Sequence, residues 1–83
     1  MGGFANELSQ QEIKHGYSLL RLMDHLDREL DRLHQQRLAA GLSSLEGQQL
    51  TRVRQSHLRK KQDCIQEMDR IGFNAWLMER QLA

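Results

Sequence analysis

The fold of this chain is decided by the stretch Gly41-Leu42-Ser43-Ser44-Leu45-Glu46. Gly41 can adopt a positive φ without steric cost, which suits the residue that follows the last turn of a helix. Ser43-Ser44-Leu45-Glu46 reads S-x-x-E, the pattern of a capping box at a helix start. The stretch therefore predicts a turn over residues 41–44, between a helix that ends near residue 40 and a second helix that begins near residue 45.

The same capping pattern occurs earlier in the chain, in Ser9-Gln10-Gln11-Glu12. The apolar residues that follow are spaced by four and three residues alternately, as in the seam of a coiled coil: Leu19, Met23, Leu26, Leu30 and Leu33. We predict a first helix over residues 10–40, preceded by a flexible leader over residues 1–8.

The second helical segment continues the same kind of seam to about residue 80. Its apolar positions keep the alternating spacing from the single cysteine onward: Cys64, Met68, Ile71, Ala75, Met78 and Leu82. Antiparallel pairing about Ser44 places Gly16 opposite Gly72, which would let the two backbones approach closely. We therefore predict an all-α fold, a coiled-coil-like antiparallel hairpin in one domain over residues 9–83, with the second helix over residues 45–80.

Composition excludes several classes of protein. The chain has 83 residues, which is the size of one domain, and a net charge of +1. Its one cysteine rules out an internal disulfide framework. We find neither a signal-peptide pattern nor an apolar run near the roughly 18 residues of a membrane span. We expect a cytoplasmic protein without a membrane partner.

Two long helices cannot bury all of the apolar residues outside the seam. We expect a protein partner or a second copy of the chain to cover them, and a homodimer that forms a four-helix bundle is the simplest arrangement. Aromatic residues and Met are typical anchors of such contacts. We therefore nominate six partner-binding residues, of which the two leucines of the first helix oppose the others: Leu20, Leu22, Phe73, Trp76, Leu77 and Met78.

An alternative for the aromatic patch is that it packs within the monomer. In that arrangement Phe4 and Leu8 of the leader fold back over Trp76. Both interpretations hold together if the patch closes a dimer.

A cluster of basic residues in the second helix supports a different function. A nucleic acid could bind to these side chains through its phosphates: Arg52, Arg54, Arg59, Lys60 and Lys61. No aromatic residue interleaves them to stack on a base. The structural alternative is a charged rim that faces acidic residues at the same level of the first helix, which sets the register of the pair: Asp24, Asp27, Glu29 and Asp31.

No pattern in the chain indicates a reaction. His15, His25 and His34 follow at intervals of ten and nine residues, so they do not form the i, i+4 pair of a helical zinc site. His57 and Cys64 would lie about 10 Å apart along a helix. We expect no metal, cofactor, small-molecule substrate or enzymatic activity, and we interpret the chain as an adaptor, co-chaperone or small regulatory subunit.

Two segments carry a resemblance to a known family. Residues 22–30, Leu-Met-Asp-His-Leu-Asp-Arg-Glu-Leu, and residues 58–65, Leu-Arg-Lys-Lys-Gln-Asp-Cys-Ile, resemble the YdcH-like family of small bacterial helical-hairpin proteins. The second segment is out of step by one residue, and the chain continues beyond the family's usual end. The resemblance implies a helical hairpin. In size and layout the chain is also similar to the YscE-like co-chaperones of type III secretion, which cap a larger chaperone.

Overall fold

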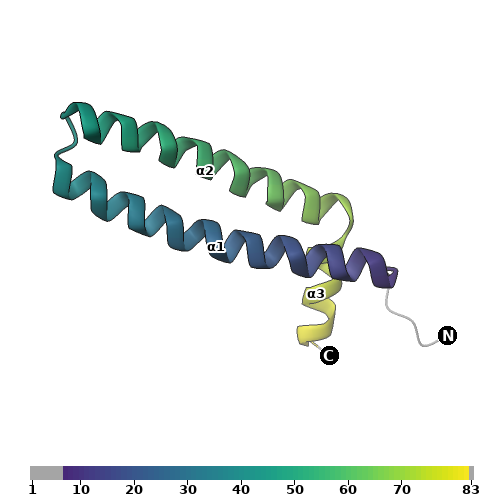
Figure 1. The fold of residues 1–83 in the computed structure, drawn as a ribbon. Helices are drawn as coiled ribbons and strands as arrows, with labels where there is room; N and C mark the ends of the chain where they lie inside the picture. The colour runs from purple at the N-terminus through teal and green to yellow at the C-terminus, as the bar shows by residue number, and fades with distance from the viewer. Residues whose placement is uncertain (1–6, 83) are drawn as a thin grey trace.

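The computed structural model describes residues 7–82, which form three α-helices. Helix α1 spans Gln10–Ala40, α2 spans Leu45–Arg70 and α3 spans Phe73–Leu82. Helices α1 and α2 lie side by side and antiparallel, and α3 bends away from the end of α2 toward the N-terminal half of α1 (Figure 1). The predicted all-α class is confirmed. The described chain has a third helix that the predicted two-helix hairpin lacks.

Helix α1 begins with the capping box that the sequence predicts. The Ser9 hydroxyl accepts the backbone N–H of Glu12 at 3.1 Å, and the Glu12 carboxylate accepts the backbone N–H of Ser9 at 2.9 Å. Gly41 ends the helix with a φ of 89°, and its N–H donates to the carbonyl of Arg37 at 3.0 Å. Both ends of α1 therefore follow from local sequence signals.

The start of α2 differs from the predicted capping box by one residue. Ser44, and not Ser43, is the N-cap, and its hydroxyl accepts the backbone N–H of Gly47 at 3.0 Å. A Cβ atom on Gly47 would lie 2.1 Å from the carbonyl oxygen of Gly41. Only glycine fits at this position of the tight turn, which explains a residue that is otherwise unfavourable in a helix.

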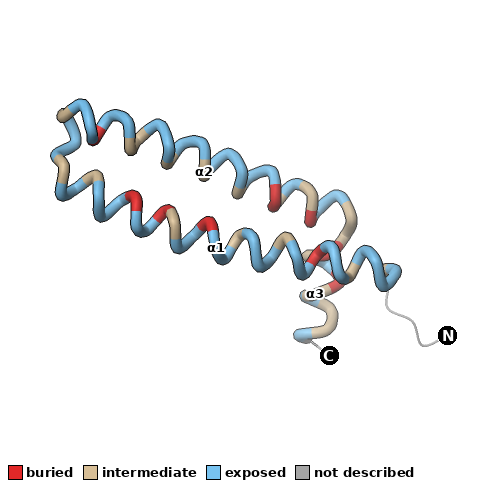
Figure 2. Tube along the Cα trace, viewed as in Figure 1, coloured by how far each residue is buried: buried red, intermediate tan, exposed pale blue. Residues whose placement is uncertain are grey.

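The core has two parts, and buried residues follow the facing sides of α1 and α2 (Figure 2). Between the two long helices, Leu26, Leu30, Leu33 and Cys64 are buried at predicted seam positions. At the end of the hairpin away from the turn, a cluster of three buried residues is surrounded by six partly buried ones. Its buried members are Met68, Phe73 and Trp76, and its partly buried ones are Leu8, Ile13, Leu19, Met23, Ile71 and Leu77.

The second predicted helix, over residues 45–80, is interrupted after Arg70. Gly72 adopts a φ of 79°, and the chain bends at this residue between α2 and α3 (Figure 1). The break turns the ring of Phe73 onto α1, where it is completely buried. Full burial of a Phe side chain contributes about 1.5–3 kcal/mol. Tertiary packing therefore outweighs a seam periodicity that runs uninterrupted through Gly72.

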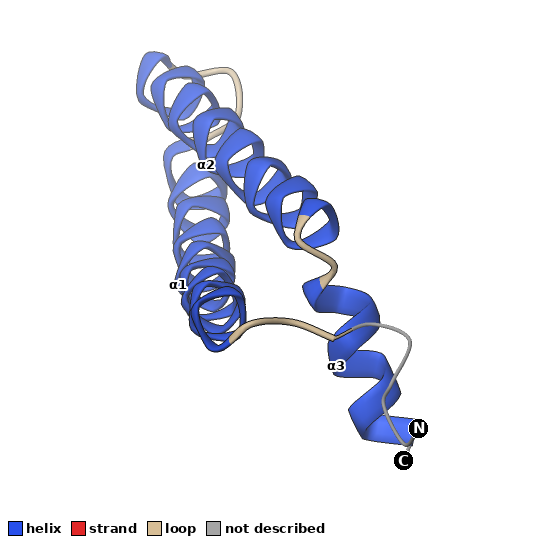
Figure 3. Cartoon of the chain, turned by 90° about the vertical axis from the view of Figure 1, so that its right-hand side faces the viewer, coloured by secondary structure: helices blue, strands red, loops and turns tan. Residues whose placement is uncertain are grey.

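Of the predicted leader, residues 1–6 lie outside the described residues, and Phe4 is among them. Leu8 packs against the cluster that contains Trp76. Residues 7–9 form a loop that passes from the start of α1 toward α3 (Figure 3). The molecule extends 61 × 19 × 15 Å, a thin rod whose helices cover one another on one side only.

Candidate functional site

One side of the hairpin carries apolar side chains that the chain itself leaves uncovered. Asp27 of α1 and Lys61 of α2 mark this side, because their charged groups meet at 2.6 Å. Residues three, four, seven or eleven positions away from either partner lie on the same face of their helix. The apolar residues with this spacing that are not fully buried form what we call the apolar side: Leu20, Met23 and Leu38 on α1, and Leu50, Leu58 and Ile65 on α2.

Three leucines of the apolar side are open to solvent. The exposed fractions are 38% for Leu20, 54% for Leu38 and 39% for Leu58. Beside Leu20 lies an open depression of about 400 Å³, lined also by Met23 and by three charged residues: Arg21, Asp24 and Asp27. Exposed apolar residues that are bordered by polar and charged ones occur at surfaces that contact other proteins.

Two charged residues on this side take part in none of the ion pairs found within residues 7–82. Arg54 lies seven residues before Lys61, and its Nε atom is buried without a hydrogen-bond partner. Asp31 lies four residues after Asp27 and takes part in none of the ion pairs of the described chain. The apolar side therefore presents one basic and one acidic group that form no ion pair in the described monomer.

Helix α3 contacts α1 through a notch at Gly16. A Cβ atom on Gly16 would lie 2.0 Å from Cδ1 of Phe73, so the ring occupies the space that a side chain would fill. The Tyr17 ring meets the Phe73 ring edge-on, with centroids 5.1 Å apart. We call this recess the Gly16 notch and define it by Gly16, Tyr17 and Met68. Met68 belongs to the buried cluster that contains Phe73 and Trp76.

Trp76 completes the contact between α3 and α1. Its ring stacks on Phe73 at 5.6 Å and meets Tyr17 edge-on at 6.2 Å. The guanidinium of Arg80 lies 4.3 Å from the centroid of the indole ring, in a cation–π contact. The indole Nε1, however, is buried without a hydrogen-bond partner, and an unsatisfied buried donor costs about 1–3 kcal/mol.

The nominated aromatic anchors lie inside the monomer. Phe73 is 0% and Trp76 7% exposed, and Leu77 is half-buried against the same cluster. Met78 is 60% exposed. The alternative in which the aromatic patch packs within the monomer describes this arrangement better. Its main contact is with Gly16 and α1, while Leu8 contributes at the edge.

The two nominated leucines of α1 lie on different sides of the hairpin. Leu20 belongs to the apolar side. Leu22 follows His15 by seven residues and shares its face of α1, where His15 contacts Glu67 of α2 at 3.4 Å. The structure therefore does not bring Leu20 and Leu22 into one surface.

Sequence reasoning missed Tyr17 and assigned the wrong partner to Gly16. The close approach at Gly16 is made by the Phe73 ring, whereas the nearest atom to a Cβ on Gly72 belongs to Leu8. A signal was present, because Gly16 and Tyr17 are adjacent and α3 holds Phe and Trp three residues apart.

The basic residues of α2 divide into two groups. Lys61 pairs with Asp27, and Arg54 is half-buried on the apolar side. Arg52, Arg59 and Lys60 are exposed. Two of the four acidic residues of the predicted rim pair within α1, Asp24 with Arg28 at 2.6 Å and Glu29 with Arg32 at 2.5 Å. The predicted rim of complementary charge is thus represented, within the described chain, by the ion pair of Lys61 with Asp27.

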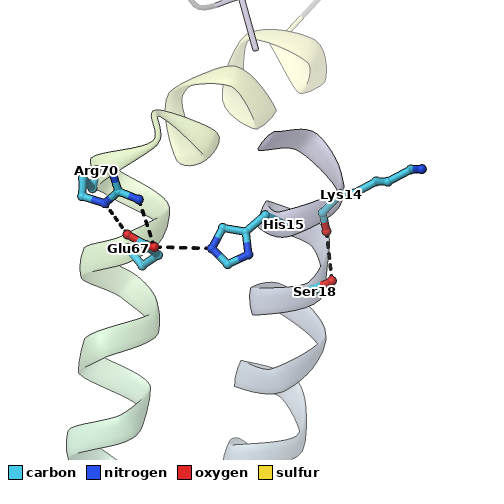
Figure 4. Close-up of polar contacts among 5 residues, drawn as sticks. All are labelled: Lys14, His15, Ser18, Glu67 and Arg70. Atoms are coloured by element: carbon cyan, nitrogen blue, oxygen red, sulfur yellow. Dashed lines mark hydrogen bonds and ion pairs between the residues drawn. The ribbon is translucent and has the colours of Figure 1, made fainter. Parts of the chain in front are cut away.

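A second polar link joins the helices beside the α3 contact (Figure 4). The Glu67 carboxylate accepts hydrogen bonds from Arg70 and contacts the Nε2 atom of His15 at 3.4 Å. The hydrogen bond from Arg70 is the main reason that the pKa of Glu67 falls from 4.5 to about 2, and His15 lowers this pKa further. Glu67 therefore stays ionised over most of the acid range.

This pKa shift predicts an acid-dependent loss of stability. The folded chain holds Glu67 ionised, so its contribution is fully present above pH 4.5 and is lost as the pH falls toward 2. We expect the urea midpoint of Glu67→Gln to lie below that of the unmodified chain at pH 6, and the two midpoints to converge near pH 2. Gln66→Ala, at an exposed neighbouring position without a titratable group, is the control and should show no such convergence.

Cys64, the only cysteine of the chain, is buried. Burial in the hairpin raises the pKa of the Cys64 thiol, and nearby Asp63 raises it further. Within the described residues, no three His, Cys, Asp or Glu side chains converge as metal ligands would. None of the helices described over residues 7–82 is long and apolar enough to cross a membrane.

Comparisons of the chain with models of protein families, with curated proteins and with solved structures find no match.

Proposed function

We propose that this chain is a non-enzymatic protein–protein interaction module, such as an adaptor, a co-chaperone or a small regulatory subunit, that binds through the apolar side of its hairpin. The observation that supports the proposal is the exposure of Leu20, Leu38 and Leu58 on one side of a thin rod. Burying partly exposed leucines contributes roughly 1 kcal/mol each. A helical partner with its own apolar face would gain this free energy for several residues at once.

The occupant that we propose is a second copy of the chain. Two hairpins that pack through their apolar sides form a four-helix bundle, in which the leucines of each copy cover those of the other. Charge supports this choice, because Asp31 of α1 and Arg54 of α2 are both without an ion-pair partner in the described monomer. In a two-fold dimer, Asp31 of one copy and Arg54 of the other would form two equivalent ion pairs.

Sedimentation equilibrium tests this proposal directly. We expect a dimer for the unmodified chain, and for Leu38→Gln with Leu58→Gln a dissociation constant at least about 100-fold higher, since each change occurs twice in the interface. Leu45→Gln at the turn end is the matched control and should leave the constant unchanged. A chain that stays monomeric at about 1 mM, the range of the weakest specific associations, would contradict the proposed dimer.

Charge reversal tests the same interface by a different property. Asp31→Arg and Arg54→Asp should each weaken the dimer, and the two changes together should restore part of the lost affinity. If the double variant is no better than the worse single variant, the two residues do not meet across the interface.

The second candidate function is nucleic-acid binding, favoured by the exposed side chains of Arg52, Arg59 and Lys60. Arg52 and Arg59 are seven residues apart and therefore share a face of α2. Binding to random DNA or RNA that is micromolar or tighter, falls steeply with salt and is lost in Arg59→Gln with Lys60→Gln would favour it. The same variant should leave the dimer of the first proposal intact.

A further inference from the structure

We propose that the Gly16 notch is an exchangeable docking site, and that it receives α3 either from its own chain or from a second copy of the chain. The ligand that fits it is a short helix with two aromatic residues three positions apart, as Phe73 and Trp76 are. This inference uses none of the six residues that define the apolar side, and its test is carried out with that side disabled.

The first observation concerns which face of α3 is buried. The seam spacing of α2 continues across Gly72 to Ala75 and Met78. In the structure, however, both of these seam residues are exposed, and the buried residues Phe73 and Trp76 lie between seam positions. Helix α3 therefore carries two apolar faces. Phe73 and Trp76 are buried in the bent chain, whereas Ala75 and Met78 would continue the seam if α2 and α3 formed one straight helix.

The second observation is geometric. Each helical residue turns the chain by about 100°, so Phe73, nine residues after the seam residue Cys64, would lie about 180° away from it in a straight helix. In that form Phe73 points away from its own α1 and cannot enter its own Gly16 notch. The vacant notch and the outward ring then complement each other between two copies, as in a domain-swapped dimer.

The third observation is the hinge. It consists of Ile71 and Gly72 only, and short hinges of this kind favour exchange between copies. A Cβ atom on Gly72 would meet nothing closer than Leu8 at 3.8 Å, so a larger residue has space at position 72. The positive φ of Gly72 is therefore what disfavours a substitution there in the bent chain. An exchanged α3 makes the same apolar contacts, and residue 72 no longer needs a positive φ.

Gly72→Ala should shift the chain toward the exchanged dimer. Alanine is strained at a φ of 79° but favoured in a continuous helix. By light scattering, we expect the variant to dimerise at concentrations at least tenfold below those of the parent chain that keeps Gly72, with Trp76 still shielded from acrylamide. Gly41→Ala is the matched control, because Gly41 also has a positive φ and open space around it, but lies at the other end of the rod.

The background of this experiment separates it from the proposed function. All variants also carry Leu38→Gln and Leu58→Gln, which remove the apolar side as an alternative interface. A Gly72→Ala chain that remains monomeric in this background overturns the exchange, whether Trp76 is shielded or open to acrylamide. A dimer in which Trp76 becomes accessible overturns it too, because the ring then occupies no notch.

Complementation between two variants identifies the contact itself. One variant adds Gly16→Leu, which fills the notch but keeps α3, and the other adds Phe73→Ala, which keeps the notch but lacks the ring. We expect each to be monomeric alone and the mixture to give a heterodimer in native mass spectrometry. Absence of the heterodimer from a mixture of two helical variants would overturn the proposal.

Discussion

Phe73→Ala is expected to remove about 3–5 kcal/mol of stability, the largest loss from any single truncation in this chain. The ring is completely buried, stacks on Trp76 and meets Tyr17 edge-on. A chain of this length has a free energy of unfolding of roughly 4–12 kcal/mol. The substitution therefore brings the contact between α3 and α1 close to the limit of stability. Urea unfolding followed by circular dichroism measures the loss.

Fluorescence of Trp76, the only tryptophan, shows where the loss occurs. In Phe73→Ala the indole emission should shift to the red before any helix unfolds, because the ring that covers one of its faces is gone. Met78→Ala on the same helix is the control. Since Met78 is exposed, its truncation should change the free energy of unfolding by no more than about 0.5 kcal/mol. Equal losses in the two variants would contradict the assigned core.

Gly16→Ala is expected to destabilise the chain although alanine is the better helix former. Replacement of a helical glycine by alanine ordinarily contributes about 1 kcal/mol of stability. Here the new Cβ atom would lie 2.0 Å from the Phe73 ring, and the ring is held by two aromatic neighbours. Overpacking of this kind costs about 1–3 kcal/mol, and displacement of the ring adds the loss of its burial. We expect a net loss of about 2 kcal/mol in urea unfolding.

The sign of the Gly16→Ala effect should reverse when Phe73 is absent. In a Phe73→Ala background, the methyl group added at position 16 enters the space that the ring has left, and only the gain in helix propensity remains. The double variant should thus be about 1 kcal/mol more stable than Phe73→Ala alone. A Gly16→Ala change that destabilises both backgrounds equally would show that the conflict at Gly16 is not with Phe73.

Much of the hairpin could be predicted because its signals are local. The Ser9 capping box, the positive φ of Gly41 and the seam around Leu30 depend on residues within a few turns of one another. The second cap is Ser44 and not Ser43, and the close contact between Gly47 and Gly41 is a property of the closed turn. Spacing alone does not report such a contact.

The break at Gly72 could not be predicted from the same periodicity, because the seam spacing is identical in a bent and in a straight helix. What decides between them is the burial of Phe73 against Gly16, a residue from the opposite end of the chain. The candidate site shows the same limit. We nominated Leu20, Leu22 and Trp76 together from their apolar character alone. In the structure, Leu20 and Leu22 lie on two sides of the hairpin and Trp76 lies in the core.

The division of the core between the hairpin and the α3 corner has a kinetic consequence. Contacts next to the turn close short loops, whereas Phe73 and Gly16 are separated by 57 residues (73 − 16) of the 83, and their contact closes a much longer loop at a higher entropic cost. Folding is then expected to zip from the turn and to seat the aromatic rings last. Truncation of Phe73 should accordingly accelerate unfolding and leave the refolding rate nearly unchanged.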